Sequence, residues 1–398
     1  MAFVSSLTPP QAPKTTPLQN LVAMPHRLFF FAGIVQGLLL MLLLGLQYGL
    51  GFYLHVNTFY YHVFGMSFVV FTQFFVGFLL TTFPRYLARP SPAKESYFLA
   101  AISLNIGGLC LILAGFFWSG LLWPALILVF AGYAKLFWEL VKLQLQSIVA
   151  NKTDTSWLLG AFALGGIGQI LFMINPFLPV KSLATGVSFY LYLFLVVMVV
   201  SQKMIPFFAA NVLQGYVVKK SHYFLHSIFA GLLAKVILQS MELNTLLADL
   251  FLLVVLAYEL LRWNLPFRNS PPILWVLFLS IWWTPVGFFL FSLDGIFKAL
   301  NIGITLGHAP LHALALGYFT TILIGFGTRV LLGHSGREPT ADKYTVMLFM
   351  LIQVMVVVRI FADLFSSFYI DQIVVTLFLW LAVFGWWSGR YAKILFEK

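Results

Sequence analysis

The sequence predicts an all-α polytopic membrane protein that crosses the bilayer about twelve times, with both termini on the cytoplasmic side. Of its 398 residues, 61% are hydrophobic and only 9% are charged, whereas soluble proteins carry about 25% charged residues. Apolar runs of about 20 residues, long enough to span a bilayer as helix, recur along the chain. Lysine and arginine gather in every second loop, which is the pattern of cytoplasmic loops.

Twelve apolar segments are separated by charged, proline, glycine or asparagine residues. The expected spans are residues 28–54, 59–83, 96–117, 121–143, 157–175, 182–200, 222–240, 244–263, 271–293, 300–328, 343–365 and 367–388. Residues 1–24 contain a Pro- and Thr-rich stretch and lack the apolar core of a secretory signal. We therefore expect a disordered cytoplasmic tail over residues 1–24 and a single twelve-helix domain over residues 25–398.

The basic residues fix the orientation of these spans. With the N-terminus inside, 18 lysines and arginines fall in inner segments, and only Lys181 and Lys298 fall in outer ones. A missed or extra helix would invert every later loop and abolish this separation. The net charge of +11 is thus explained by anionic lipid at the inner leaflet, with no need for a nucleic-acid partner.

Ionisable groups inside a span are costly and usually have a partner or a function. Lys135 with Glu139, and Arg359 with Asp363, are spaced i,i+4 and are expected to neutralise each other on one helix face. Lys235 has no such partner in its own span. Asp249 on the next span is its nearest candidate.

Histidines supply the candidate ligands, because imidazole is the commonest metal ligand in proteins. His222 and His226 lie at the inner start of the seventh expected span, and His308 and His312 lie in the tenth. An i,i+4 pair places two imidazoles on one helix face about 6 Å apart, which suits one metal ion or two neighbouring centres. One haem with two axial histidines would instead need ligands from two helices. A structural, hydrogen-bonded role is the alternative for each of these histidines.

The spans also predict the depth of each histidine. His62 lies at the outer start of the second span, and His308 and His312 lie roughly 12–18 Å inside the outer start of the tenth. His334 follows the inner end of the tenth span. This separation favours two sites over one. The single cysteine, Cys110, excludes an internal disulfide and a covalent C-x-x-C-H haem attachment.

Four segments of the chain resemble the NnrS family. Residues 311–337, LHALALGYFTTILIGFGTRVLLGHSGR, are similar to its most characteristic segment, a His-Ala-Leu helix that leads to Thr-Arg-Val and a Gly-His-(Thr/Ser)-Gly-Arg end. Weaker similarities lie in residues 24–31 (MPHRLFFF), 77–84 (GFLLTTFP) and 203–211 (KMIPFFAAN), where Lys203 stands in place of the family's arginine.

The resemblance implies a twelve-span protein of the bacterial inner membrane that binds noncovalent haem b and copper and takes part in the response to nitric oxide, in denitrification or nitrosative stress. Carried over by motif position, it implies His312, Arg329, His334 and Arg337 as site residues, with His62 as the counterpart of the family's second-helix histidine. His62, His308 and His312 are the candidate metal ligands. The arginines could pair with haem propionates. Family members often have His-x-His-Glu where this chain reads Tyr60-Tyr61-His62-Val63.

Two other functions remain open. The first is an enzyme that reduces nitric oxide or oxygen at a haem–metal pair with an unknown electron donor, although no stretch matches the motifs of the haem–copper oxidases. The second is a secondary transporter, for which twelve spans is a common number. The absence of a visible half-to-half repeat argues against transport.

Overall fold

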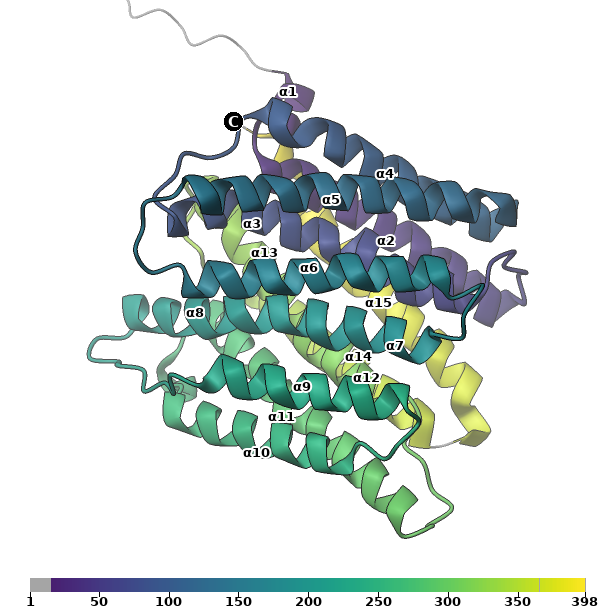
Figure 1. The fold of residues 1–398 in the computed structure, drawn as a ribbon. Helices are drawn as coiled ribbons and strands as arrows, with labels where there is room; N and C mark the ends of the chain where they lie inside the picture. Colours follow the sequence, from purple (N-terminus) through teal and green to yellow (C-terminus); the bar gives the residue numbers. More distant parts are fainter. Residues whose placement is uncertain (1–15, 365, 398) are drawn as a thin grey trace, which may run out of the picture.

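The structure is a computed structural model that describes residues 16–364 and 366–397. The described part of the chain consists of helices and connecting loops, without a strand. The long helices run roughly side by side between two ends of one bundle (Figure 1). We call the end that carries residues 17–23 and 392–396 the inner end and the opposite one the outer end. The predicted fold class, an all-α polytopic membrane protein, is confirmed.

The principal helical elements follow the predicted spans closely. They are α1 (Pro17–Ala23), α2 (Pro25–Leu50), η1 (Phe59–Phe71) continuing into α3 (Thr72–Tyr86), α4 (Lys94–Phe116), η2 (Ser119–Leu121) continuing into α5 (Leu122–Gln146), α6 (Thr153–Ile174), α7 (Lys181–Gly186) continuing through η3 (Val187–Phe194) into α8 (Leu195–Val212), α9 (Phe224–Ser240), α10 (Leu246–Trp263), α11 (Pro272–Ala299), α12 (Ala309–His312) continuing through η5 (Ala313–Thr320) into α13 (Thr321–His334), α14 (Lys343–Leu364), and α15 (Tyr369–Tyr391) with η7 (Ala392–Phe396).

Ten helices of the described chain are long and apolar enough to cross a membrane. The seventh and eighth predicted spans correspond to α9 and α10, which lie outside that group. Helix α9 has only 17 residues, and α10 carries Asp249, Glu259 and Arg262. Twelve crossings, with both termini inside, therefore stay a prediction.

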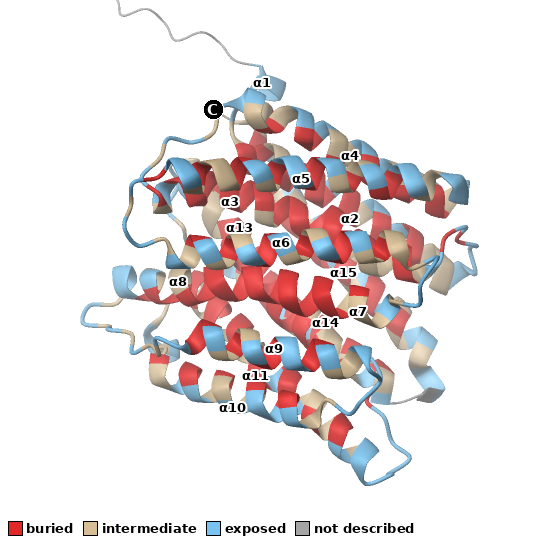
Figure 2. Cartoon of the chain, viewed as in Figure 1, coloured by how far each residue is buried: buried red, intermediate tan, exposed pale blue. Residues whose placement is uncertain are grey.

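Three of these helices form the centre of the bundle. In Phe59–Tyr86, Lys181–Val212 and Ala309–His334, 78%, 89% and 83% of the most apolar stretch is buried, against at most 61% in the other candidate spans. Figure 2 shows α8 buried along most of its length, whereas α5, α6 and α10 alternate buried and exposed residues. The central helices are the second, sixth and tenth in the order of predicted spans. The other helices surround them and expose one face, as lipid-facing helices do.

Each central helix contains a π-helical segment, namely η1, η3 or η5. Such segments shift the backbone hydrogen bonds by one residue, and threonine hydroxyls occupy two of the junctions. Thr72 donates to the carbonyl of Ser67 at 2.8 Å, and Thr320 donates to that of Ala315 at 3.0 Å. π-Helical turns are rare and often lie at functional sites. They also set the direction in which His62, within η1, and His312, just before η5, face the bundle.

The tenth predicted span begins nine residues too early. Helix α11 continues to Ala299, and residues 300–308 form a loop before α12. The carboxylate of Asp294 holds this loop, because it accepts hydrogen bonds from the backbone N–H of Leu306 at 2.7 Å and the hydroxyl of Thr305 at 3.1 Å. Pro310 then starts the helix at a position where a missing N–H costs nothing. His308 therefore precedes the helix and His312 lies in its first turn, nearer the outer end than predicted.

The expected N-terminal tail contains a helix within residues 16–24. Thr16 and Gln19 form a reciprocal capping box at the start of α1, and Leu21 is buried. The amide of Asn20 donates to the backbone oxygen of Phe396 at 3.0 Å, so α1 lies against η7 at the end of the chain (Figure 1). The prediction for residues 1–15 lies outside the described residues.

Candidate metal centre

Three histidines lie close together at the outer end. We call His62, His308 and His312 the outer histidine cluster. His62 comes from η1 and His312 from α12, so two of the three central helices contribute. The ring centroids of His62 and His312 are 6.5 Å apart with only 16° between the ring planes, and those of His308 and His312 are 6.4 Å apart at 73°.

Hydrogen bonding leaves imidazole nitrogens free for a ligand. Nδ1 of His312 lies 3.0 Å from the backbone oxygen of His308. A carbonyl oxygen only accepts, so Nδ1 carries the proton and Nε2 keeps its lone pair, as in many metal-binding histidines. Nδ1 of His62 is buried and has no hydrogen-bond partner in the described chain. Buried polar atoms are normally satisfied, so this unpartnered nitrogen points to a missing ligand.

The outer cluster is a site of facing imidazoles and not a chelating triad. Within residues 16–364 and 366–397, no three His, Cys, Asp or Glu side chains are grouped closely enough to hold one metal ion. His308 is exposed, while His62 and His312 are half-buried. The pair His62–His312 is therefore the part of the cluster in which a ligand would be enclosed.

A buried ion pair lies beside this cluster. Arg359 and Asp363, both on α14, form the predicted i,i+4 salt bridge with side chains 7% and 5% exposed. Arg359 is close enough to both His62 and His312 to act on them electrostatically. Gly307 approaches Asp363 so closely that a Cβ there would lie 2.9 Å from a carboxylate oxygen, and its φ of +50° also favours glycine.

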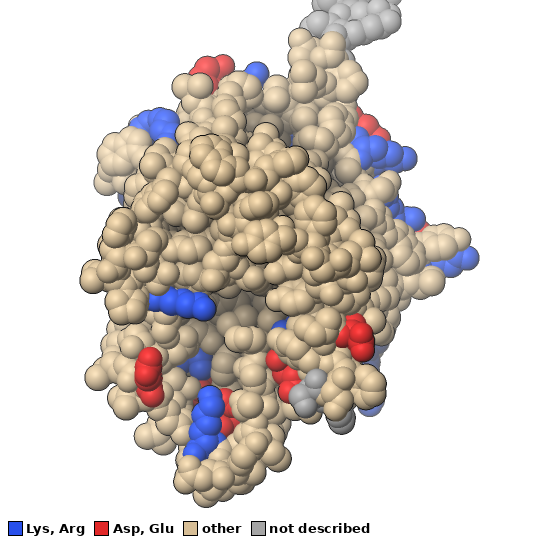
Figure 3. All heavy atoms as spheres, turned by 90° about the vertical axis from the view of Figure 1, so that its right-hand side faces the viewer, with Lys and Arg blue, Asp and Glu red and all other residues tan. Residues whose placement is uncertain are grey.

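Figure 3 looks onto the outer end of the bundle, where this cluster lies. A hollow is visible near the middle of the face, with acidic and basic side chains beside and below it. Ion pairs occur at this end, and Lys298 with Asp294 at 2.6 Å is one of them.

A second pair of histidines lies at the inner end. The rings of His26 and His334 are 4.6 Å apart between centroids with 32° between planes. His26 is buried, and its Nδ1 lies 3.4 Å from the hydroxyl of Thr81. Arg27 and Arg85 act electrostatically on both imidazoles. About 22 residues of helix, roughly 33 Å at 1.5 Å per residue, separate His334 from His312, so the two histidine pairs are different sites.

The two predicted arginines belong to the inner end as well. Arg329 lies 4.0 Å above the ring of Phe208, and Arg337 forms a 2.7 Å salt bridge with Glu397. Arg329 is 17 residues along the helix from His312, or roughly 25 Å. Neither arginine can reach a ligand held between His62 and His312.

His222 and His226 lie apart from both histidine pairs. His222 precedes α9 and His226 lies in its first turns, and both are exposed. The ring of His226 packs edge-on against Trp157 at 5.1 Å, and that of His222 against Tyr223 at 5.2 Å. Their predicted role as ligands stays a prediction, and the arrangement of their neighbours gives it no support.

Sequence reasoning placed the charged pairs correctly but missed two residues. Lys235 and Asp249 form the predicted cross-helix pair at 2.6 Å, and Lys135 and Glu139 pair at 2.6 Å. Arg359 was expected only to neutralise Asp363, and His26, two residues before the first expected span, was given no role. For His26, its place in the MPHRLFFF segment was a usable signal. For Arg359, burial beside two imidazoles has no local signal in the sequence.

Comparison with known proteins identifies one family. The family described as NnrS protein matches residues 20–398, which is nearly the whole chain. No curated protein and no solved structure matches this chain significantly.

Proposed function

Since this chain belongs to the NnrS family, we propose that it is a haem-binding protein of the bacterial inner membrane that binds nitric oxide. His62 and His312 would hold the haem b noncovalently. Nitric oxide binding there serves detoxification or the response to nitrosative stress. The finding that carries this proposal is the facing of two imidazoles from separate central helices at the outer end of the bundle.

The spacing of the two rings suits one metal between them. A metal–nitrogen bond of about 2 Å on each side puts two imidazole centroids roughly 6 Å apart when both rings bind from opposite faces. The 6.5 Å between the ring centroids of His62 and His312 agrees with this distance, and the two ring planes are nearly parallel, at 16°. The unpartnered Nδ1 of His62 and the free Nε2 of His312 supply the two donors.

Other residues fit the remaining parts of a haem. Its propionates need cationic partners, and Arg359, which is paired with Asp363, is a buried cation that acts electrostatically on both imidazoles. This assigns to Arg359 the role that the sequence suggested for Arg329 and Arg337. Bound haem would supply an iron that takes a small gas in place of one of the two imidazoles. The protein would supply the two imidazole nitrogens, a charge partner and an apolar surrounding that sets the iron's properties.

Copper is the second metal that the family implies. His308 is the remaining imidazole of the outer cluster, on the exposed side and 6.4 Å from His312. Imidazole suits copper well. We propose that copper binds at this side of the cluster, adjacent to the haem.

An absorption spectrum and metal analysis of purified protein from a haem-replete host test this proposal. The wild type should show a Soret band that shifts when nitric oxide is added. In His62→Ala and in His312→Ala the Soret band should be lost or should shift away from the wild-type position, because one histidine ligand is missing. His222→Ala is the matched control, because its side chain is exposed and distant, and it should keep the wild-type spectrum.

Folded wild-type protein that lacks haem and copper would contradict the proposal. So would wild-type spectra in both His62→Ala and His312→Ala. Consumption of nitric oxide by the purified protein with an added electron donor would extend the proposed role from binding to reduction.

A further inference from the structure

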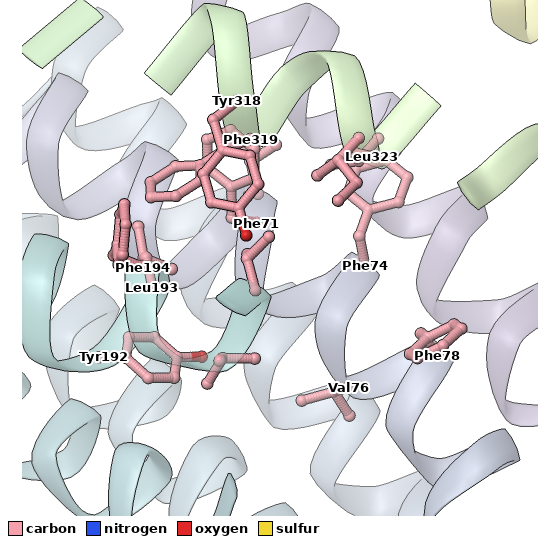
Figure 4. Close-up of a cluster of buried hydrophobic side chains, with 14 of the residues drawn as sticks. Phe71, Phe74, Val76, Phe78, Tyr192, Leu193, Phe194, Tyr318, Phe319 and Leu323 are labelled. Carbon is pink, nitrogen blue, oxygen red and sulfur yellow. The ribbon is translucent and has the colours of Figure 1, made fainter. Parts of the chain in front are cut away.

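An apolar cavity of about 50 Å³, partly open to the bundle surface, lies among the central helices and α2. Helices α2, α3, α8 and α13 contribute its walls. The lining residues are Phe30, Phe74, Phe75, Phe78, Leu79, Val196, Val197, Val200, Ile322, Leu323, Phe326 and Gly327. Figure 4 shows three of them, Phe74, Phe78 and Leu323, on one side of the buried aromatic cluster.

The chemistry of the walls excludes polar ligands. Every lining side chain is apolar. A water molecule needs two to four polar partners to stay in a cavity, and apolar cavities of this kind remain dry. A charged or strongly polar ligand would lose its hydration without compensation.

The size of the cavity excludes large ligands. Pockets for drug-sized molecules and cofactors enclose about 300–1,000 Å³, several times the volume here. A water-sized particle occupies about 10–15 Å³ by the same kind of measure. The cavity can therefore hold a few atoms, which corresponds to a diatomic or monatomic gas.

The position of the cavity gives it a route to lipid. Phe75 is half-buried, while the other lining residues are buried, so the cavity approaches the bundle surface at Phe75. Small uncharged gases dissolve in lipid and need no polar channel. On the inner side, Phe30 lies one helical turn from His26, with ring centroids 6.2 Å apart.

From these observations we propose that the cavity is a binding site for a small uncharged gas, filled from the lipid at Phe75. The identification of this gas as nitric oxide rests on the proposed function, whereas the proposal that the cavity binds a gas does not. Protein interiors are close-packed, and an empty space of this size lowers stability. A gas that enters from the bilayer is then concentrated inside the bundle, between the inner and outer ends.

Xenon is a suitable probe, because it binds dry apolar cavities without any metal or haem. The structure of the full-length protein would be determined under xenon pressure, and anomalous scattering would locate the bound atoms. The expected result is a xenon atom bounded by Val197, Phe78 and Leu323. Val200→Phe, which puts a ring into the cavity, should abolish this site. Val197→Ile adds one methyl group, should fold normally, and should lower the occupancy.

Val354→Phe is the matched control. Val354 is 51% exposed on α14 and does not line the cavity. The variant should therefore bind xenon at the same site as the wild type. Wild-type protein without xenon in the cavity, while other apolar sites are filled, would overturn the proposal. So would ordered water or a lipid chain in the cavity, or equal occupancy in Val200→Phe. If the purified protein lacks haem but still binds xenon in this cavity, the proposed function is refuted and the gas-binding proposal stands.

Discussion

Lys235 and Asp249 are a charged pair in the interior of the bundle. Their atoms lie 2.6 Å apart, with side chains 1% and 0% exposed. Thr245 donates a further hydrogen bond of 2.6 Å to Asp249, and the ammonium of Lys235 lies 3.6 Å from the ring centre of Phe291. Each charge is thus compensated by the other. Removing one leaves a charge that has neither water nor a counter-ion.

Lys235→Met should lower the free energy of unfolding by about 3–5 kcal/mol, because it leaves Asp249 buried and unpaired. Thermal unfolding of the purified protein would show this as a lower Tm. The double variant Lys235→Met/Asp249→Leu should recover most of the loss. Lys298→Met is the control, since Lys298 is largely exposed, and it should have little effect. A Tm of wild-type value in Lys235→Met would contradict the expectation.

Lys220 gives a prediction about pH. It lies in the inner loop between α8 and α9, outside the spans, and hydrogen-bonds to both oxygens of Gln202. The pKa of Lys220 is lowered from 10.5 to about 8, chiefly by burial; Lys203 contributes to the lowering, and Asp154 and Glu259 oppose it.

Between pH 8 and 10.5 the unfolded chain therefore binds more protons at Lys220 than the folded chain does, so the stability contributed by this group rises with pH through that window. Below pH 8 the full penalty of burying the charge remains. We expect the Tm of the wild type to rise relative to that of Lys220→Met as pH increases from 8 to 10. Parallel pH profiles of the two proteins would show that Lys220 is not the responsible group.

At the scale of the elements, the π-helical segments control where the central helices point their side chains. Thr72 donates to the Ser67 carbonyl, five residues earlier, and its oxygen lies 2.8 Å from the hydroxyl of Tyr192 on η3. Thr72 therefore links η1 to η3 and also lies at the end of η1. His62 lies in the same segment, so a change to the α-helical pattern would rotate its ring relative to α3.

Thr72→Val should lower the free energy of unfolding by about 1–3 kcal/mol, because it leaves buried polar groups without partners. It should also increase amide hydrogen exchange within η1. Thr376→Val is the control, since Thr376 makes an ordinary bond to the carbonyl of Gln372, four residues earlier. Equal effects of the two substitutions on η1 would argue against a special role for the Thr72 junction.

The elements also show how far the sequence determines the fold. Hydropathy and charge located every long helix, because lipid requires about 20 apolar residues for each span. The start of the tenth was wrong, since residues 300–306 are apolar enough for a helix. They form a loop because Asp294 binds Thr305 and Leu306, which are more than ten residues away. Hydropathy contains no information about such a contact.

The candidate site was predicted in part for a similar reason. The histidines were visible as residue types, and their assignment to the inner or outer half followed from the spans, although His308 and His312 lie nearer the outer end than predicted. Which of them face each other depends on the packing of the second helix against the tenth, and no local pattern predicts that His62 meets His312. The pairing of His26 with His334, and the position of Arg359, depend on packing between distant segments as well.

At the scale of the whole molecule, the distribution of basic residues predicts which end faces the cytoplasm. The loop at residues 300–308 belongs to the outer end, and the loop at residues 335–342 belongs to the inner end. Gly303 and Glu338 are exposed residues in these two loops. A Cβ added at Gly303 would meet no other side chain or backbone atom within 4 Å.

In a Cys110→Ser background, Gly303→Cys should react with a membrane-impermeant maleimide in intact spheroplasts of a bacterial host. Glu338→Cys should react only after the membrane is opened, because the positive-inside rule places its loop in the cytoplasm. The measurement is the fraction of labelled protein before and after lysis. Reversed labelling, or labelling of both cysteines in intact spheroplasts, would refute the orientation.

The contact between the two ends of the chain has a consequence for the order in which the protein is made. Asn20 binds the backbone of Phe396, and Arg337 binds Glu397, so the first described helix finds its partner 376 residues later in the chain. Domains generally begin to fold from the N-terminus during synthesis. Here the inner end, with His26 and His334, stays incomplete until η7 has been made, and a nascent chain stalled before η7 would lack this closure.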